Sequence, residues 1–152
     1  MTDQTDPAPA RLQRSDTVRI AASADAVWAV VGDLASLVPG GGMLERIDLD
    51  GAGAGAIRTF HLHGGATVVE RIESHDPAQR RYAYRVLDAG PLPFADYVGA
   101  AAVAADGAET CILTWSADAA PAGVDSATLG AIVEANLNGA LQAVAAHFRP
   151  PA

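Results

Sequence analysis

Cysteine and basic residues are both scarce in this chain of 152 residues. The single cysteine, Cys111, excludes a disulfide within the chain and a zinc site built from several thiolates. Lysine and arginine together number 10 against 18 acidic residues, which gives a formal net charge of −8. Nucleic acids and anionic membrane surfaces both attract basic patches, so we expect neither as a partner.

Long hydrophobic runs are also missing. No stretch of about 18 apolar residues occurs that would predict a membrane span, and the N-terminus lacks the basic and then apolar pattern of a signal peptide. Both observations favour a cytoplasmic location. Half of the residues are hydrophobic and only 18% are charged, which is typical of a folded domain with a sizeable core. We therefore expect a flexible, proline-bearing tail over residues 1–15 and one domain over residues 16–149.

Alternation of apolar and polar residues, the two-residue period of strands, dominates the chain up to residue 119. It predicts seven strands, at residues 16–21, 43–49, 57–63, 66–76, 80–88, 94–105 and 109–119. Gly64-Gly65 and Asp106-Gly107 are hairpin signals between neighbouring strands. Consecutive hairpins of this kind make an antiparallel sheet.

Helical spacing appears in three places. The long apolar stripe from Gly123 to Phe148 predicts a helix that Asp125 or Ser126 caps. Two short helices are predicted after the first strand, one between Ser23 and Gly32 and one over residues 34–38, before the glycine run at 40–42 breaks the chain. The predicted fold class is α+β, with the helices on one side of the antiparallel sheet.

The register of the hairpin around Gly64-Gly65 decides which side chains face the helix. A three-residue turn pairs Arg58 with Glu70 and puts Phe60 on the same face. A two-residue turn would instead place Arg58 opposite Arg71, which is repulsive. We favour the first register. By the same alternation, Tyr82, Tyr84, Tyr97 and Trp115 share the inner face of the later strands.

An inward-facing Arg58–Glu70 pair allows two interpretations, because burying charges is costly unless they are well bonded. Glu70 could act as a general base and Arg58 could receive a ligand carboxylate or phenolate, with Tyr82 as a further catalytic candidate. The simpler interpretation, which we favour, is a salt bridge that shapes the wall.

Two other polar features allow site hypotheses. His61 and His63 share one strand face, as two metal ligands would, but Glu70 lies on the opposite face in the favoured register, so we expect no metal site. Asn136 lies beside the apolar stripe of the last helix, where it would hydrogen-bond either a ligand or a buried water.

The order of elements resembles the START-like (SRPBCC) helix-grip superfamily, and more narrowly its polyketide cyclase/dehydrase and lipid-transport-like group. The resemblance spans residues 17–148. Its carriers are AASADAVWAVVGD (21–33), GAGAIRTFHLHGGATVVERI (53–72), RRYAYRV (80–86), GPLPFADY (90–97) and TCILTWSA (110–117). It implies a curved seven-stranded sheet that grips the C-terminal helix around a deep, mostly apolar cavity. The group often has a tryptophan where this chain has LVPGGG (37–42), which predicts an altered or wider cavity mouth.

Two functions follow from this resemblance. The first is binding of a small hydrophobic molecule, of an aromatic or polyketide-like kind, by a monomer or homodimer that needs no cofactor. The alternative is an enzyme of the aromatase/cyclase type, and the sequence leaves open whether any reaction is catalysed. The expected ligand-binding residues are Arg58, Phe60, Glu70, Tyr82, Tyr84, Tyr97, Trp115 and Asn136.

Overall fold

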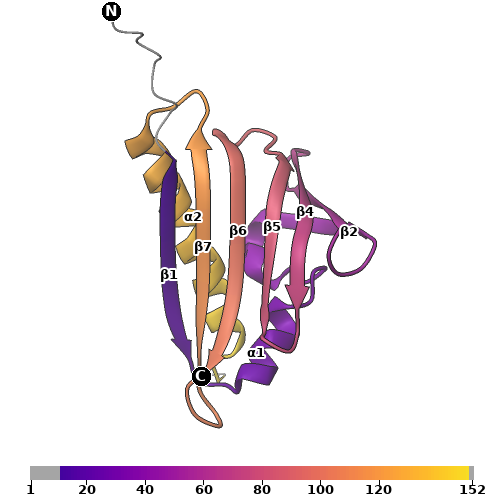
Figure 1. Ribbon diagram of the computed structural model, residues 1–152, viewed down its shortest axis with the longest axis vertical. Helices are drawn as coiled ribbons and strands as arrows, with labels where there is room; N and C mark the ends of the chain where they lie inside the picture. Colours follow the sequence, from indigo (N-terminus) through magenta and orange to yellow (C-terminus); the bar gives the residue numbers. More distant parts are fainter. Residues whose placement is uncertain (1–10, 151–152) are drawn as a thin grey trace, which may run out of the picture.

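The computed structural model describes residues 11–150, which form one antiparallel sheet with its helices on one side (Figure 1). The seven strands lie in the order β1-β7-β6-β5-β4-β3-β2, which confirms the predicted α+β class. Their bounds are β1 Leu12–Ile20, β2 Leu44–Asp50, β3 Ile57–Leu62, β4 Thr67–Asp76, β5 Arg81–Asp88, β6 Phe94–Ala105 and β7 Cys111–Pro121. No helix within residues 11–150 is long and apolar enough to cross a membrane.

The long C-terminal helix α2 (Ser126–His147) packs against β1, β7 and the 3₁₀ helix η1 (Val38–Met43). Asp125 caps it by accepting the N–H of Thr128 at 2.7 Å. The helix buries an apolar stripe at the spacing seen in the sequence. Its buried leucines and valines are Leu129, Val133, Leu137, Leu141 and Val144. The shorter helix α1 (Ala24–Val31) is capped by Ser23 and packs against β6.

Two predicted boundaries are wrong. β1 begins at Leu12, so residues 12–15 belong to the sheet and not to the predicted tail. Leu12 is buried opposite Ala119 of β7, and this pairing with a distant strand holds a stretch that is too polar to show alternation. Residues 1–10 of the predicted tail lie outside the described residues.

The second short helix also differs from its prediction over residues 34–38. Residues 34–37 form turns and bends, and η1 follows them and includes the glycine run that the sequence suggested as a break. Proline is favoured in the first turn of a helix, and Pro39 occupies that position. Gly41 adopts a φ of 58°, which interrupts the helix and favours glycine.

The register of the β3–β4 hairpin is the predicted one. Arg58 lies opposite Glu70 and Phe60 lies opposite Val68. The N–H of Leu62 donates to the carbonyl of Ala66 at 2.9 Å, which closes the three-residue turn. The predicted inner face is confirmed as well, because Tyr82, Tyr84, Tyr97 and Trp115 are all buried.

Gly99 of β6 lies opposite Tyr84 of β5 and leaves the space that the tyrosine ring occupies. A Cβ atom at this position would overlap the ring of Tyr84. Gly139, in contrast, lies on the exposed side of α2, and a Cβ there would meet no atom within 4 Å. A side chain is therefore excluded at Gly99 and has free space at Gly139.

We expect Gly99→Ala to lower the free energy of unfolding by about 1–3 kcal/mol, as overpacking of a filled site does. Gly139→Ala should instead raise it by up to about 1 kcal/mol, because alanine favours a helix more than glycine does. Urea unfolding followed by circular dichroism measures both changes. Equal midpoints for Gly99→Ala and the unaltered protein would contradict the proposed packing of Tyr84.

Candidate functional site

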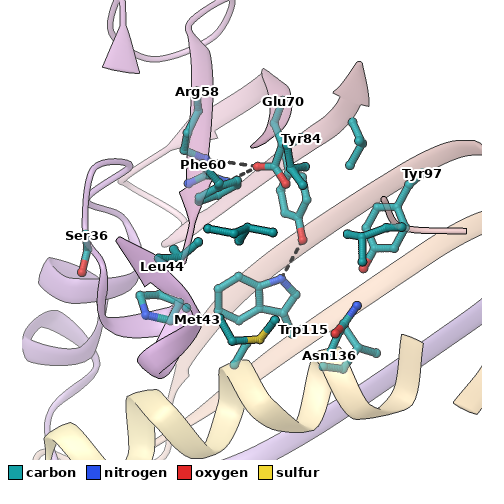
Figure 2. Close-up of a pocket in the computed structure, with 18 of the residues that line it drawn as sticks. Ser36, Met43, Leu44, Arg58, Phe60, Glu70, Tyr84, Tyr97, Trp115 and Asn136 are labelled. Atoms are coloured by element: carbon teal, nitrogen blue, oxygen red, sulfur yellow. Dashed lines mark hydrogen bonds and ion pairs between the residues drawn. The ribbon is translucent and has the colours of Figure 1, made fainter. Parts of the chain in front are cut away.

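A pocket of about 210 Å³ opens between the inner face of the sheet, η1 and α2 (Figure 2). Aromatic and aliphatic side chains make most of its wall. The structure brings all eight residues expected from the sequence to this pocket, namely Arg58, Phe60, Glu70, Tyr82, Tyr84, Tyr97, Trp115 and Asn136. They come from β3, β4, β5, β6, β7 and α2, so residues far apart in the sequence line one space.

Arg58 and Glu70 form a buried ion pair on the wall of the pocket. Their exposed fractions are 5% and 6%. Two donors of the guanidinium converge on one carboxylate oxygen, with Nη2 at 2.6 Å and Nε at 3.1 Å from Oε1 of Glu70 (Figure 2). The predicted cross-strand pair therefore lies next to the open space and is largely hidden from solvent.

The remaining donors of Arg58 are held by the protein itself. Nη1 donates to the carbonyl of Leu34 at 3.3 Å, and Nη2 lies 3.5 Å from the hydroxyl of Tyr82. The guanidinium also lies over the ring of Phe60, 4.8 Å from its centroid, in a cation–π contact. Burial opposes the charge, but the neighbouring Tyr82 and Glu70 outweigh it and raise the pKa of Arg58. The guanidinium is thus a fixed positive charge.

Glu70 is in a different position. Burial raises the pKa of its carboxyl above the ordinary value, although Arg58 opposes that shift. Oε1 accepts both hydrogen bonds from Arg58, and Oε2 accepts none from the residues that the structure describes. Across residues 11–150, every fully buried side-chain nitrogen or oxygen has a hydrogen-bond partner. Oε2 therefore keeps some accessible surface, and Glu70 lines the pocket.

The aromatic residues supply hydroxyl groups that stay protonated. The indole N–H of Trp115 donates to the hydroxyl of Tyr84 at 3.0 Å. Burial raises the pKa of Tyr82 and Tyr84, and it raises the pKa of Tyr97 to about 12. At neutral pH these phenols are neutral groups that donate and accept hydrogen bonds.

The mouth of the pocket contains residues that the sequence did not suggest. Ser36, Met43 and Leu44 line it from the segment around η1, and Asn136 lines it from α2 (Figure 2). Met43 is 63% exposed, although it also lines the pocket. The glycine run before Met43 was interpreted as a break, and its packing on α2 has no local signature in the sequence.

His61 lies in β3, whereas His63 lies in the turn that follows the strand. His61 lies 2.7 Å from Oδ2 of Asp48 on the neighbouring strand β2. Within residues 11–150, no group of three or more histidine, cysteine or acidic side chains is placed to hold a metal ion. Among these residues, the His61 ring hydrogen-bonds the carboxylate of Asp48 on the neighbouring strand.

Solved structures with the same fold include proteins of several kinds. An aromatase/cyclase (Zhui) from Streptomyces sp. R1128 is 24% identical with a TM-score of 0.78, over 91% of this chain and 93% of that one. An uncharacterized protein from Bacillus thuringiensis is 23% identical with a TM-score of 0.82, over 90% and 98%. Norcoclaurine synthase from Thalictrum flavum is 20% identical with a TM-score of 0.72, over 98% and 100%.

At these identities the likeness establishes the fold and nothing about the reaction. A search of curated proteins gives no match. The family model for polyketide cyclase/dehydrase and lipid transport, in contrast, matches residues 11–149, which include every described strand and helix. The protein belongs to the polyketide cyclase/dehydrase and lipid transport family, as its sequence predicted.

Proposed function

We propose that this protein is a cytoplasmic binding protein that holds a small hydrophobic molecule, of an aromatic kind, in the pocket between the sheet and α2. The observation that carries the proposal is the pocket itself, a space of about 210 Å³ with aromatic walls and few polar groups. Concave, mostly apolar sites with a few placed polar groups are typical of small-molecule binding. The family supports the same conclusion, because its description includes lipid transport.

The shape of the wall favours flat ligands. The rings of Tyr84 and Tyr97 are stacked with centroids 6.4 Å apart, and Phe94 lies 4.5 Å from Tyr97. A bound ring would continue this series of contacts, and one such aromatic pair is worth about 0.5–1.5 kcal/mol beyond the area that it buries. An aliphatic ligand would gain only the burial.

Catalysis of the aromatase/cyclase type is the second candidate, and one observation favours it. Oε2 of Glu70 keeps some accessible surface in a residue that lines the pocket, and burial raises the pKa of that carboxyl toward the range of a general base. Arg58 and Tyr82 lie beside it. In such an enzyme Glu70 would remove a proton from the bound molecule while Tyr82 hydrogen-bonds the developing oxyanion.

Filling the pocket should abolish binding. Ala140 of α2 lines the pocket, whereas Ala146 lies on the exposed side of the same helix. We expect Ala140→Phe to weaken the binding of naphthalene at least about tenfold, because the new ring occupies its space. Ala146→Phe should leave the affinity within about twofold. Isothermal titration calorimetry measures both, and equal affinities for the two variants would place the ligand elsewhere.

Glu70 should also make stability depend on pH in an unusual direction. Because burial raises its folded pKa above the ordinary value of 4.5, its contribution is full below pH 4.5 and is lost as the pH rises through the folded pKa. The difference in unfolding free energy between the unaltered protein and Glu70→Gln should therefore fall from pH 4 to pH 8, as measured by urea unfolding.

Glu73 of the same strand is the matched control. Hydrogen bonds from Arg71 and Arg85 lower the pKa of this exposed carboxyl. Its contribution is therefore present above pH 4.5 and lost as the pH falls through the lowered folded value, so the corresponding difference for Glu73→Gln should rise with pH. If the difference in unfolding free energy for Glu70→Gln also rose with pH, Arg58 would lower the pKa of Glu70 by more than burial raises it.

A further inference from the structure

The charge of the ligand that suits this pocket can be inferred from the ion pair on its wall, and this inference rests on the proposed function. Oε2 of Glu70 lies on that wall and accepts no hydrogen bond from the residues that the structure describes. Two donors of Arg58, Nη2 and Nε, converge on Oε1 at 2.6 and 3.1 Å. Glu70 itself is only 6% exposed. A carboxylate oxygen in this position accepts a hydrogen bond from a ligand and donates none.

An anionic ligand has little to bind. Of the five N–H donors of a guanidinium, two go to Glu70, one goes to the carbonyl of Leu34 and one points at the hydroxyl of Tyr82, which leaves one on Nη1. The other charged residue that lines the pocket is Asp33, which is acidic. A ligand carboxylate would lose its hydration to enter a space whose lining has one positive and two negative groups.

A cationic ligand meets the opposite obstacle. Glu70 is already neutralised by Arg58, whose Nη2 lies 2.6 Å from Oε1. An ammonium group that approached Oε2 would come close to the guanidinium, which burial and its aromatic neighbours hold in place. Like charges at such distances repel strongly where the surroundings are apolar. A neutral hydrogen-bond donor avoids both penalties.

The size of the pocket limits the ligand as well. An engineered protein cavity of about 150 Å³ takes up benzene, and the present space measures about 210 Å³. One or two fused rings fit such a volume. A long acyl chain would have to leave it through the mouth near Met43, which is largely exposed.

We propose that the pocket selects a neutral molecule of one or two rings whose hydroxyl group donates a hydrogen bond to Oε2 of Glu70, and that it discriminates against carboxylates and ammonium ions of the same size. The aromatic walls bind the rings, and Glu70 distinguishes among ring compounds by their polar substituent.

Four ligands with a common ring system test this specificity by calorimetry at pH 7: naphthalene, 2-naphthol, 2-naphthoate and 2-naphthylmethylammonium. We expect 2-naphthol to bind at least about tenfold more tightly than naphthalene, since a hydrogen bond to a charged group contributes roughly that factor. Both ions should bind more weakly than naphthalene.

The outcomes separate this inference from the function on which it rests. If 2-naphthol binds no better than naphthalene, the role of Glu70 is overturned while the binding function stands. If 2-naphthoate binds most tightly, Arg58 is the partner of the ligand and the inference is contradicted. Tightest binding of 2-naphthylmethylammonium would contradict it as well. If none of the four binds, the proposed function fails and the specificity fails with it.

A double variant tests the residue directly. Arg58→Met with Glu70→Leu removes both charges together and avoids a single unpaired charge. It should lose the preference for 2-naphthol over naphthalene, whatever its affinity for naphthalene itself. Glu73→Gln, on the opposite face of β4, should keep the full preference. A preference for 2-naphthol that survives in the double variant would contradict the proposal. If that variant does not fold, the comparison of the four ligands on the unaltered protein still tests the proposal.

Discussion

The buried ion pair between Arg58 and Glu70 is the interaction on which much of this structure depends. It joins β3 to β4 in one register, because a shift of one residue would move every side chain of a strand to the other face. It also reaches beyond the hairpin, since Nη1 of Arg58 donates to the carbonyl of Leu34 in the segment between α1 and η1. One guanidinium therefore connects the sheet to the segment that leads to the pocket mouth.

The pair also explains why the pocket is polar at one point and apolar elsewhere. Charges can be buried only where partners satisfy them, and Arg58 finds those partners in a carboxylate, a backbone carbonyl and the faces of aromatic rings. The aromatic residues in turn need space, which Gly99 supplies to Tyr84. Such an arrangement leaves one carboxylate oxygen without a hydrogen bond from the residues that the structure describes, beside a wall of rings.

The sequence predicted the features that depend on local pattern. Alternation gave the strands and their inner faces, and the repulsion between Arg58 and Arg71 in the alternative register was enough to choose the hairpin turn that the structure shows. The eight residues expected from these patterns and from the family resemblance all line the pocket, and the sequence left open whether Arg58 and Glu70 serve a ligand or only each other.

The features that the sequence missed depend on distant contacts. Leu12 is in a strand because it pairs with Ala119, which is more than 100 residues away, and nothing in the polar segment around it indicates that partner. The 3₁₀ helix at Val38–Met43 contacts α2, which lies far along the chain, whereas local propensity alone suggested a break at its glycines. The rim of the pocket, which includes Met43, was unpredictable for the same reason.

Binding and catalysis would use the same atoms of this pocket in different ways. In a carrier, Glu70 accepts a hydrogen bond from the ligand and takes no proton from it. A raised pKa of Glu70 then changes only the strength of that hydrogen bond. An enzyme needs the carboxylate to take the proton, and Arg58 opposes this because its fixed charge stabilises the ionised form. The convergence of both Arg58 donors on Glu70 therefore weighs against a strong base, and it favours a site whose main task is to hold and select its ligand.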